Sequence, residues 1–201
     1  MNIDVEDHLS VKSVNGERKA DIESQKDLRV FGKGRLENQG NIFSTKGLSL
    51  ELDVENLKNI NGGEIILAGT PERLISFENS EKSFLVSTGD ITAFNLLNLK
   101  NLGTLQVQKN ISLQAKKIDN EGTLFGKENI EIESDTFENL TQEAKVSTKG
   151  ALSLKSRDSI INEGLIRSLD NGVLATKELK NVQEIGTGKN LTLRAGRSEE
   201  H

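Results

Sequence analysis

Apolar and polar residues alternate in short runs along the chain, and these runs return at a nearly constant distance. The clearest example is a unit of 19 residues that occurs twice in tandem, at positions 99–117 and 118–136. Each copy opens on an apolar residue, carries Asn two positions later and Gly two positions after that, and closes on an alternating run. Alternation with period two predicts β-strands. A unit that repeats at a short fixed period predicts a solenoid.

The same unit can be followed through nearly the whole chain. Steps of 19–23 residues separate the apolar residues that open successive units, which are Val14, Leu36, Leu57, Phe77, Leu99, Ile118, Phe137, Ile160 and Leu179. From the second unit on, each opener is followed two positions later by Asn, which gives Asn38, Asn59, Asn79, Asn101, Asn120, Asn139, Asn162 and Asn181. We therefore predict about nine coils.

Short alternating runs joined by turn residues, without a helical stripe, predict an all-β parallel β-helix with 19–23 residues per coil. Neighbouring coils stack ~4.8 Å apart, so nine coils would form a rod about 40–45 Å long. The repeat domain is predicted to span residues 14–196. An irregular segment or the end of a preceding coil (1–13) comes before it, and a polar tail (197–201) follows. A leucine-rich repeat, the alternative fold, has a period that overlaps this one. Its Asn follows several strand leucines, whereas here Asn follows one opener and precedes Gly, so we reject that fold.

Stacked coils assign a role to each repeated position. The openers are expected to point inward, and Leu113, Ile132 and Leu193 are expected to share one inward column. Asn is expected at a turn, where it tolerates the left-handed backbone region and where stacked amides can bond one another. The Gly after it is expected to supply a positive φ. These turn columns comprise Asn38, Gly40, Asn59, Asn101, Gly103, Asn120, Gly122, Asn162, Gly164 and Asn181.

Composition narrows the classes of function. The formal net charge is −5 and Lys and Arg form no cluster, so nothing indicates a nucleic-acid partner. No apolar run is long enough to insert into a bilayer, and the acidic start lacks the apolar core of a secretory signal. The sequence is therefore either cytosolic or a piece of a longer exported chain. Because Cys is absent, no disulfide or thiolate site is expected, and we expect no cofactor or metal.

The repeated phrase resembles the haemagglutinin repeats of filamentous haemagglutinin-like exoproteins of Gram-negative bacteria. Three pairs carry this resemblance best: Asn101/Gly103, Asn120/Gly122 and Asn162/Gly164. The units at Asn139 and Asn181 depart from it, because Thr141 and Gln183 stand where the pattern has Gly.

The resemblance implies a right-handed β-helix in a secreted, surface-exposed fibre. It also implies export through a partner outer-membrane transporter (two-partner secretion), and a receptor on a host or neighbouring cell. Such fibres act as adhesins in virulence or as stalks that present a distal effector in contact-dependent growth inhibition. We expect a structural and adhesive segment of this kind, with further coils in the parent chain and no catalysis of its own.

One cluster of carboxylates is a candidate for catalysis. Glu131, Glu133 and Asp135 alternate on one outward strand face beside Glu128. Two carboxylates beside a sugar groove would suit a β-helical polysaccharide lyase or hydrolase, which is the alternative function. A solvated strand face is favoured instead, because outward positions are polar by pattern and the chain lacks Trp and Tyr for sugar stacking.

The candidates for contact with a partner are two loops and one end. The loops contain Thr70, Pro71, Glu72 and Arg73 in one case and Thr141, Gln142 and Glu143 in the other. Function concentrates on loops that a rigid scaffold holds. The last coil, residues 179–196, is expected to end abruptly, so the chain is expected to associate end to end.

Overall fold

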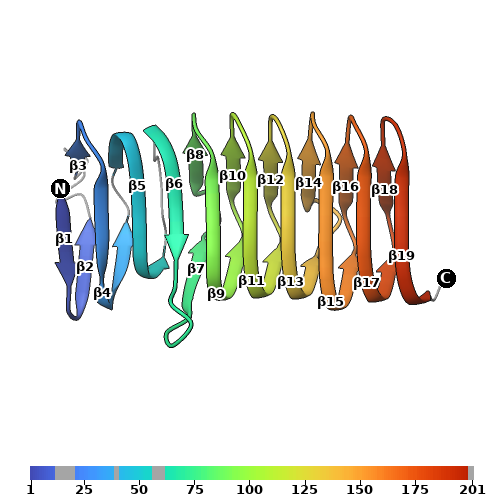
Figure 1. The fold of residues 1–201 in the computed structure, drawn as a ribbon, viewed down its shortest axis with the longest axis horizontal. Helices are drawn as coiled ribbons and strands as arrows, with labels where there is room; N and C mark the ends of the chain where they lie inside the picture. Colours follow the sequence, from blue (N-terminus) through green and yellow to red (C-terminus); the bar gives the residue numbers. More distant parts are fainter. Residues whose placement is uncertain (12–20, 39–40, 56–61, 199–201) are drawn as a thin grey trace.

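The computed structural model describes residues 1–11, 21–38, 41–55 and 62–198. The positions predicted at Val14, Gly40, Leu57 and Asn59 lie outside the described residues. Figure 1 shows a row of stacked coils, with the N-terminus at one end and the C-terminus at the other. The described part is all-β and makes about eight turns, which confirms the predicted parallel β-helix with a slightly smaller number of coils.

The strands fall into two sheets in which every described pairing is parallel. The larger, 13-stranded sheet has the order β1-β4-β5-β6-β9-β11-β13-β15-β17-β19, with β2, β3 and β7 paired beside this path. The smaller sheet has the order β18-β16-β14-β12-β10-β8. The strands are β1 (Asn2–Val5), β2 (His8–Val11), β3 (Asp21–Ser24), β4 (Leu28–Asn38), β5 (Asn41–Glu55), β6 (Gly62–Ala68), β7 (Ile75–Asn79), β8 (Phe84–Ser87), β9 (Ile91–Asn101), β10 (Thr104–Val107), β11 (Ile111–Asn120), β12 (Thr123–Gly126), β13 (Ile130–Asn139), β14 (Lys145–Thr148), β15 (Leu152–Asn162), β16 (Leu165–Ser168), β17 (Gly172–Asn181), β18 (Glu184–Thr187) and β19 (Leu191–Ser198).

The inward side chains form continuous columns, as the alternation predicts. One column runs the full length of the larger sheet through Ile3, Val30, Leu50, Leu67, Ala93, Leu113, Ile132, Leu154, Leu174 and Leu193. The shared column of Leu113, Ile132 and Leu193 is thereby confirmed. Its members from Val30 to Leu174 are buried, because each has a coil above and below it.

The opener column is confirmed in the regular half of the chain and corrected near its start. In the structure it consists of Leu9, Leu36, Val54, Phe77, Leu99, Ile118, Phe137, Ile160 and Leu179. The assignment of Leu57 was wrong, because Val54 pairs with both neighbouring coils and is buried. Val54 continues the alternating run of β5, in which Leu48, Leu50 and Leu52 are also buried. Leu9 likewise takes the position given to Val14.

Two further features differ from the predicted outline. The long strands such as β11 and β13 have 10 residues each and are longer than the short alternating runs that predicted them, because each continues through a position where the register with a neighbouring strand shifts. At the C-terminal end β19 continues through Arg197 and Ser198, which pair with β17 beyond the predicted domain end at 196. The described residues contain no helix long and apolar enough to cross a membrane.

Candidate functional site

A ladder of buried asparagines runs through the regular coils. Each member ends a strand of the larger sheet, and the Nδ2 of every member except the last donates a hydrogen bond to Oδ1 of the asparagine one coil further on. The N···O distances are 2.7, 2.8, 2.7, 2.7 and 2.7 Å along Asn79, Asn101, Asn120, Asn139, Asn162 and Asn181. The first five asparagines are completely buried. Stacked amides therefore form a polar column inside the molecule, as the sequence predicts. The predicted left-handed turn conformation is wrong for these asparagines, because each is the last residue of an extended strand and none has a positive φ.

The second amide proton of the ladder residues bonds the local backbone. Asn120 Nδ2 donates to the carbonyl of Gly122 at 3.0 Å, and Asn162 Nδ2 donates to that of Gly164 at 2.9 Å. A buried amide that is satisfied on both sides fixes the register of the coils, because a slipped coil would leave it unpaired. Asn38 ends β4 opposite Val11, so it lies at the strand position that the ladder residues occupy.

The glycines after the ladder residues have a different role from the one predicted. Among the described residues only Gly32 has a positive glycine φ, and the non-glycine residues with positive φ are Lys82, Asn95 and Thr141. Gly122 is required by close approach instead, since a Cβ there would lie 2.0 Å from the carbonyl oxygen of Gly103. The equivalent distances at Gly103 and Gly164, to the carbonyls of Ser83 and Ala144, are 2.3 and 2.2 Å. The prediction of positive φ at these glycines is wrong. Glycine is required at them for another reason, because the backbone of the preceding coil occupies the space of a side chain.

The ladder has one open acceptor. Asn79 Oδ1 is buried and has no hydrogen-bond partner among the described residues. The described strand of the preceding coil ends at Glu55, which pairs with Glu78.

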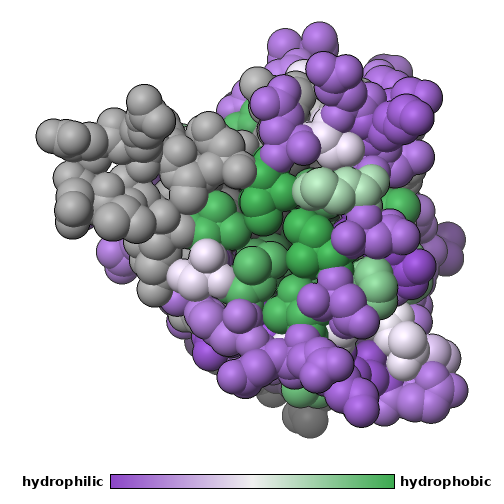
Figure 2. Space-filling view, turned by 90° about the vertical axis from the view of Figure 1, so that its left-hand side faces the viewer, coloured by the Kyte–Doolittle hydropathy of each residue, from purple (hydrophilic) through white to green (hydrophobic). Residues whose placement is uncertain are grey.

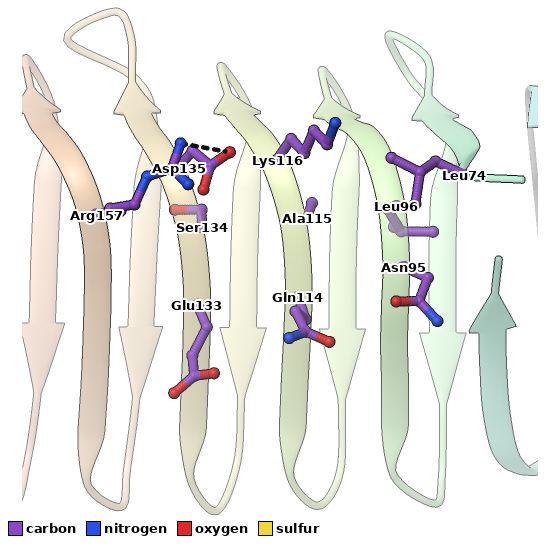
Figure 3. Close-up of a pocket in the computed structure, with 10 residues that line it drawn as sticks. All are labelled: Leu74, Asn95, Leu96, Gln114, Ala115, Lys116, Glu133, Ser134, Asp135 and Arg157. Atoms are coloured by element: carbon purple, nitrogen blue, oxygen red, sulfur yellow. Dashed lines mark ion pairs between the residues drawn. The ribbon is translucent and has the colours of Figure 1, made fainter. Parts of the chain in front are cut away.

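A groove crosses the outward face of the larger sheet where the pairing of the long strands becomes irregular. The register shifts between Leu113 and Ala115 and again between Ser134 and Thr136, as at β-bulges. The resulting hollow has a volume of about 370 Å³. Figure 3 shows the residues that line it, which are Leu74, Asn95, Leu96, Gln114, Ala115, Lys116, Glu133, Ser134, Asp135 and Arg157. The sequence analysis did not predict this groove. A signal was present, because inward Ala115 and inward Ile118 are three residues apart, and this odd spacing interrupts the period-two alternation and indicates a bend in the strand.

A second hollow of about 410 Å³ adjoins the first. The two share Glu133, Ser134 and Arg157, and the second extends to Lys177 on β17. We call the two together the outward groove. It runs along the axis of the stack and crosses successive coils at equivalent positions.

The carboxylates considered for catalysis lie on β13 beside this groove, and each faces a cation from β15. Glu133 lies 3.1 Å and Glu131 3.8 Å from Nζ of Lys155, and Asp135 lies 3.2 Å from the guanidinium of Arg157. The hydrogen bond from Lys155 to Glu133 raises the pKa of the ammonium. Glu128 is exposed before the strand begins. The arrangement is a set of exposed ion pairs between coils, which mixes signs along the column.

An equivalent ion pair stands near the N-terminal end of the stack. Arg29 Nε and Nη2 donate to the two carboxylate oxygens of Glu51 at 2.6 and 2.5 Å. This bidentate contact lowers the pKa of Glu51, because the hydrogen bonds favour its charged form. Among the described residues no group of three or more His, Cys, Asp or Glu is placed to hold a metal ion.

The first candidate loop, between β6 and β7, projects beyond the row of turns in Figure 1. Pro71 and Glu72 are exposed, while Thr70 Oγ1 accepts a hydrogen bond from the backbone N–H of Arg73 at 3.0 Å. The Arg73 guanidinium donates to the backbone carbonyls of Gly32 and Lys33 in β4. The loop is therefore tied to an irregular strand some 40 residues earlier in the chain, a contact that sequence reasoning did not anticipate.

The second candidate loop, between β13 and β14, presents Thr141, Gln142 and Glu143 to solvent. Thr141 has a φ of 84°, in the left-handed region, and stands where the regular coils have Gly. Three of the four extra residues of this coil are accommodated here, and the fourth lies in β15, where the register with β13 shifts between Ser134 and Thr136. The chain returns from the loop through a hydrogen bond from Ala144 N to the carbonyl of Thr141 at 3.2 Å.

Comparison of the chain with protein-family models finds no match, and comparison with curated proteins and with solved structures finds no significant match either.

Proposed function

We propose that the chain is a structural and adhesive segment of a secreted, surface-exposed fibre of the filamentous haemagglutinin-like kind. The observation that carries the proposal is continuity: one inward column extends from Ile3 at one end of the larger sheet to Leu193 at the other. A stack of this kind repeats its outward positions at ~4.8 Å intervals along the axis. It is suited to hold other parts of a protein at a distance and to present many similar contacts to a surface.

The geometry of the turns, which recurs from coil to coil, supports this family as the proposal. The resemblance rests on Asn and Gly two residues apart, and the structure gives each a physical reason: Asn120 belongs to the buried ladder and Gly122 abuts backbone. In this proposal the fibre reaches the surface of a Gram-negative cell through an outer-membrane transporter. It then acts either as an adhesin or as a stalk for an effector in contact-dependent growth inhibition.

Adhesion can be measured with beads that carry the purified chain. We expect these beads to be retained under flow on layers of epithelial cells or on lawns of Gram-negative bacteria, above beads coated with albumin. Substitution of the exposed loop residues Glu72, Gln142 and Glu143 by Ala separates contact through the loops from contact through the strand faces. Failure of the coated beads to bind any of these surfaces would contradict the adhesive function.

The alternative, a carbohydrate-active enzyme, draws its support from the outward groove, because Glu133 and Asp135 line it. Incubation with a panel of acidic and neutral polysaccharides, followed by assays for new reducing ends and for unsaturated products, distinguishes the two functions. The scaffold proposal predicts no turnover. Turnover that disappears in Glu131→Gln or Glu133→Gln would establish the enzyme instead.

A further inference from the structure

We propose that Asn171 is a site of spontaneous deamidation, at which the exposed side-chain amide becomes a carboxylate while the stack stays folded. The site lies in the turn directly before β17, and the reaction needs no partner other than water. This modification is independent of the adhesive function above. Three features of the turn support it: the residue that follows Asn171, the hydrogen bonds of its side chain, and an equivalent position that already carries a carboxylate.

The turns before the long strands of the larger sheet carry a second ladder of side chains, distinct from the buried one. It occupies the positions directly before β9, β11, β13, β15, β17 and β19, which are Asp90, Asn110, Asn129, Ala151, Asn171 and Asn190. The backbone N and Nδ2 of Asn110 both donate to Oδ1 of Asp90 at 3.0 Å. Those of Asn129 donate to Oδ1 of Asn110 at 3.2 and 3.0 Å. A typical asparagine of this ladder is therefore both donor and acceptor.

Asn171 is an acceptor only. Its Oδ1 accepts hydrogen bonds from the backbone N and from Nδ2 of Asn190, both at 3.3 Å. One coil earlier the ladder position is Ala151, which has no side-chain oxygen to accept a bond. Among the described residues, Nδ2 of Asn171 has no hydrogen-bond partner. Removal of this amide nitrogen therefore breaks no hydrogen bond of the turn.

The residue after Asn171 leaves the reacting atoms accessible to one another. Deamidation begins when the backbone nitrogen of the following residue attacks the side-chain Cγ, and a side chain on that residue hinders the approach. Gly172 has no side chain, whereas Asn110 precedes Ile111, which branches at Cβ. Packing excludes a larger residue at 172, because a Cβ there would lie 2.4 Å from Cγ2 of Thr187. Asn–Gly also occurs at 15–16 and 61–62, where at least one residue of each pair lies outside the described part of the chain.

The atoms of the reaction balance with water as the only co-reactant. The nitrogen of Gly172 forms a bond to Cγ of Asn171, the Cγ–Nδ2 bond breaks, and ammonia leaves with the proton of the Gly172 nitrogen. Water then adds to one of the two carbonyl carbons of the cyclic imide and opens it to aspartate or isoaspartate. In the folded chain the Gly172 N–H donates to the carbonyl of Asn190 at 2.8 Å. Attack requires this bond to open, so the reaction is slower in the folded chain than in the unfolded one.

The surroundings of the turn admit water and tolerate an added negative charge. Asn171 is exposed. Turns of the stack lie on its hydrophilic rim, which Figure 2 shows around an apolar centre at the N-terminal end. Lys189 of the next coil lies 3.0 Å from the carboxylate of Asp170 and contributes a positive charge to the same turn region.

The aspartate product fits the turn, because Asp90 already occupies an equivalent position. Oδ1 of Asp90 accepts two hydrogen bonds from Asn110, just as Oδ1 of Asn171 accepts two from Asn190. A carboxylate at 171 can therefore keep both bonds. The isoaspartate product instead lengthens the main chain by one methylene group directly before β17, where Gly172 pairs with Leu191 of β19.

Mass spectrometry after prolonged incubation of the folded chain in mildly alkaline buffer tests the proposal. Trypsin separates the sites to be compared, since Asn171 lies in the peptide 168–177 and Asn110 in the peptide 110–116. The peptide 168–177 should shift by the mass difference between an amide and an acid, and the peptide 110–116 should keep its amide. In Asn171→Gln the shift should be lost, because the longer side chain forms the corresponding ring far less readily. A peptide 168–177 that stays unchanged in the folded chain, or equal conversion of both peptides, would overturn the proposal.

Asn171→Asp and Asn110→Asp compare the same chemical change at two positions of the ladder. Asn171→Asp should leave the urea midpoint of unfolding where it is in the unchanged chain. Asn110→Asp should lower the midpoint, because it removes the bond from Nδ2 to Asp90 and sets two carboxylates against one another. If Asn171→Asp lowered the midpoint as much as Asn110→Asp does, the fold would not accept a carboxylate at 171, and the proposal would be wrong.

Discussion

The buried ladder makes Asn120→Ala the most informative single substitution. Asn120 is completely buried, its Oδ1 accepts from Nδ2 of Asn101 at 2.8 Å, and its Nδ2 donates to Oδ1 of Asn139 at 2.7 Å. Truncation to Ala removes both bonds at once. It leaves an amide proton of Asn101 and the side-chain acceptor of Asn139 without these partners, in a place that water does not reach.

The expected loss follows from the cost of unpaired buried polar groups. Each costs about 1–3 kcal/mol, so two of them lower the free energy of unfolding by about 2–6 kcal/mol before any cavity is counted. This is a large part of the ~5–15 kcal/mol that stabilises a typical domain. Asn181→Ala is the matched control. Asn181 is exposed at the end of the ladder, so water can replace its bonds and the loss should stay below about 1 kcal/mol.

Urea unfolding at neutral pH, followed by far-ultraviolet circular dichroism, measures both variants. The difference between the free energies of unfolding of the two variants gives the stability that an asparagine of the ladder contributes because it is buried. This comparison requires that both variants unfold with the same dependence of free energy on urea concentration. Equal losses at Asn120 and Asn181 would refute the reasoning, because the same amide would then be worth as much in water as inside the stack.

Three further predictions follow from the columns and their charges. Gly122→Ala should lower the free energy of unfolding by at least about 1–3 kcal/mol in the same urea experiment, because its Cβ would overlap a backbone carbonyl. Gly186→Ala, where the nearest atom is a flexible carboxylate 3.2 Å away, should be nearly neutral. Leu113→Asp should cost several kcal/mol by burying an unpaired charge, whereas Gln114→Lys on the outward side should change stability little; similar effects would mean that the alternation is misassigned. Because Glu51 has a lowered pKa, its ion pair stabilises the protein above about pH 5 and loses this effect as the pH falls through the lowered pKa. The difference in stability between the unchanged chain and Glu51→Gln should therefore shrink on acidification, and a difference that grows would contradict the assigned pairing.

The periodic part of the structure could be predicted from the sequence because two independent patterns agree in it. Alternation places Leu113 and Ile132 inward, and the recurring Asn fixes how far one coil is displaced from the next. Near Leu57 the two patterns compete: the spacing of Asn59 favoured Leu57 as opener, but the alternating run of β5 reaches Val54 first. Burial of that run determined the register.

The remaining features depend on contacts between coils that a single repeat does not reveal. A Gly two residues after Asn suggests a backbone conformation, and only the stacked structure shows that a neighbouring carbonyl occupies the space of its side chain. The attachment of Arg73 to β4 joins positions about 40 residues apart outside the repeat pattern. The carboxylates of β13 were correctly expected on one outward face. Their cations come from β15, one coil further on. The coil between β13 and β15 is longer than 19 residues, so the sequence alone does not show which residues of β15 lie beside the carboxylates of β13.

The proposed function rests on one physical claim, that the coils form a single continuous stack in which each is stabilised by its neighbours. Amide hydrogen exchange, read by mass spectrometry at a dilution where the chain is monomeric, tests this claim most directly. The account predicts the slowest exchange in β11 and β13, which have coils on both sides, and much faster exchange in β19, which has one neighbour. Rapid exchange throughout β11 and β13, or protection of β19 equal to that of β13, would contradict it.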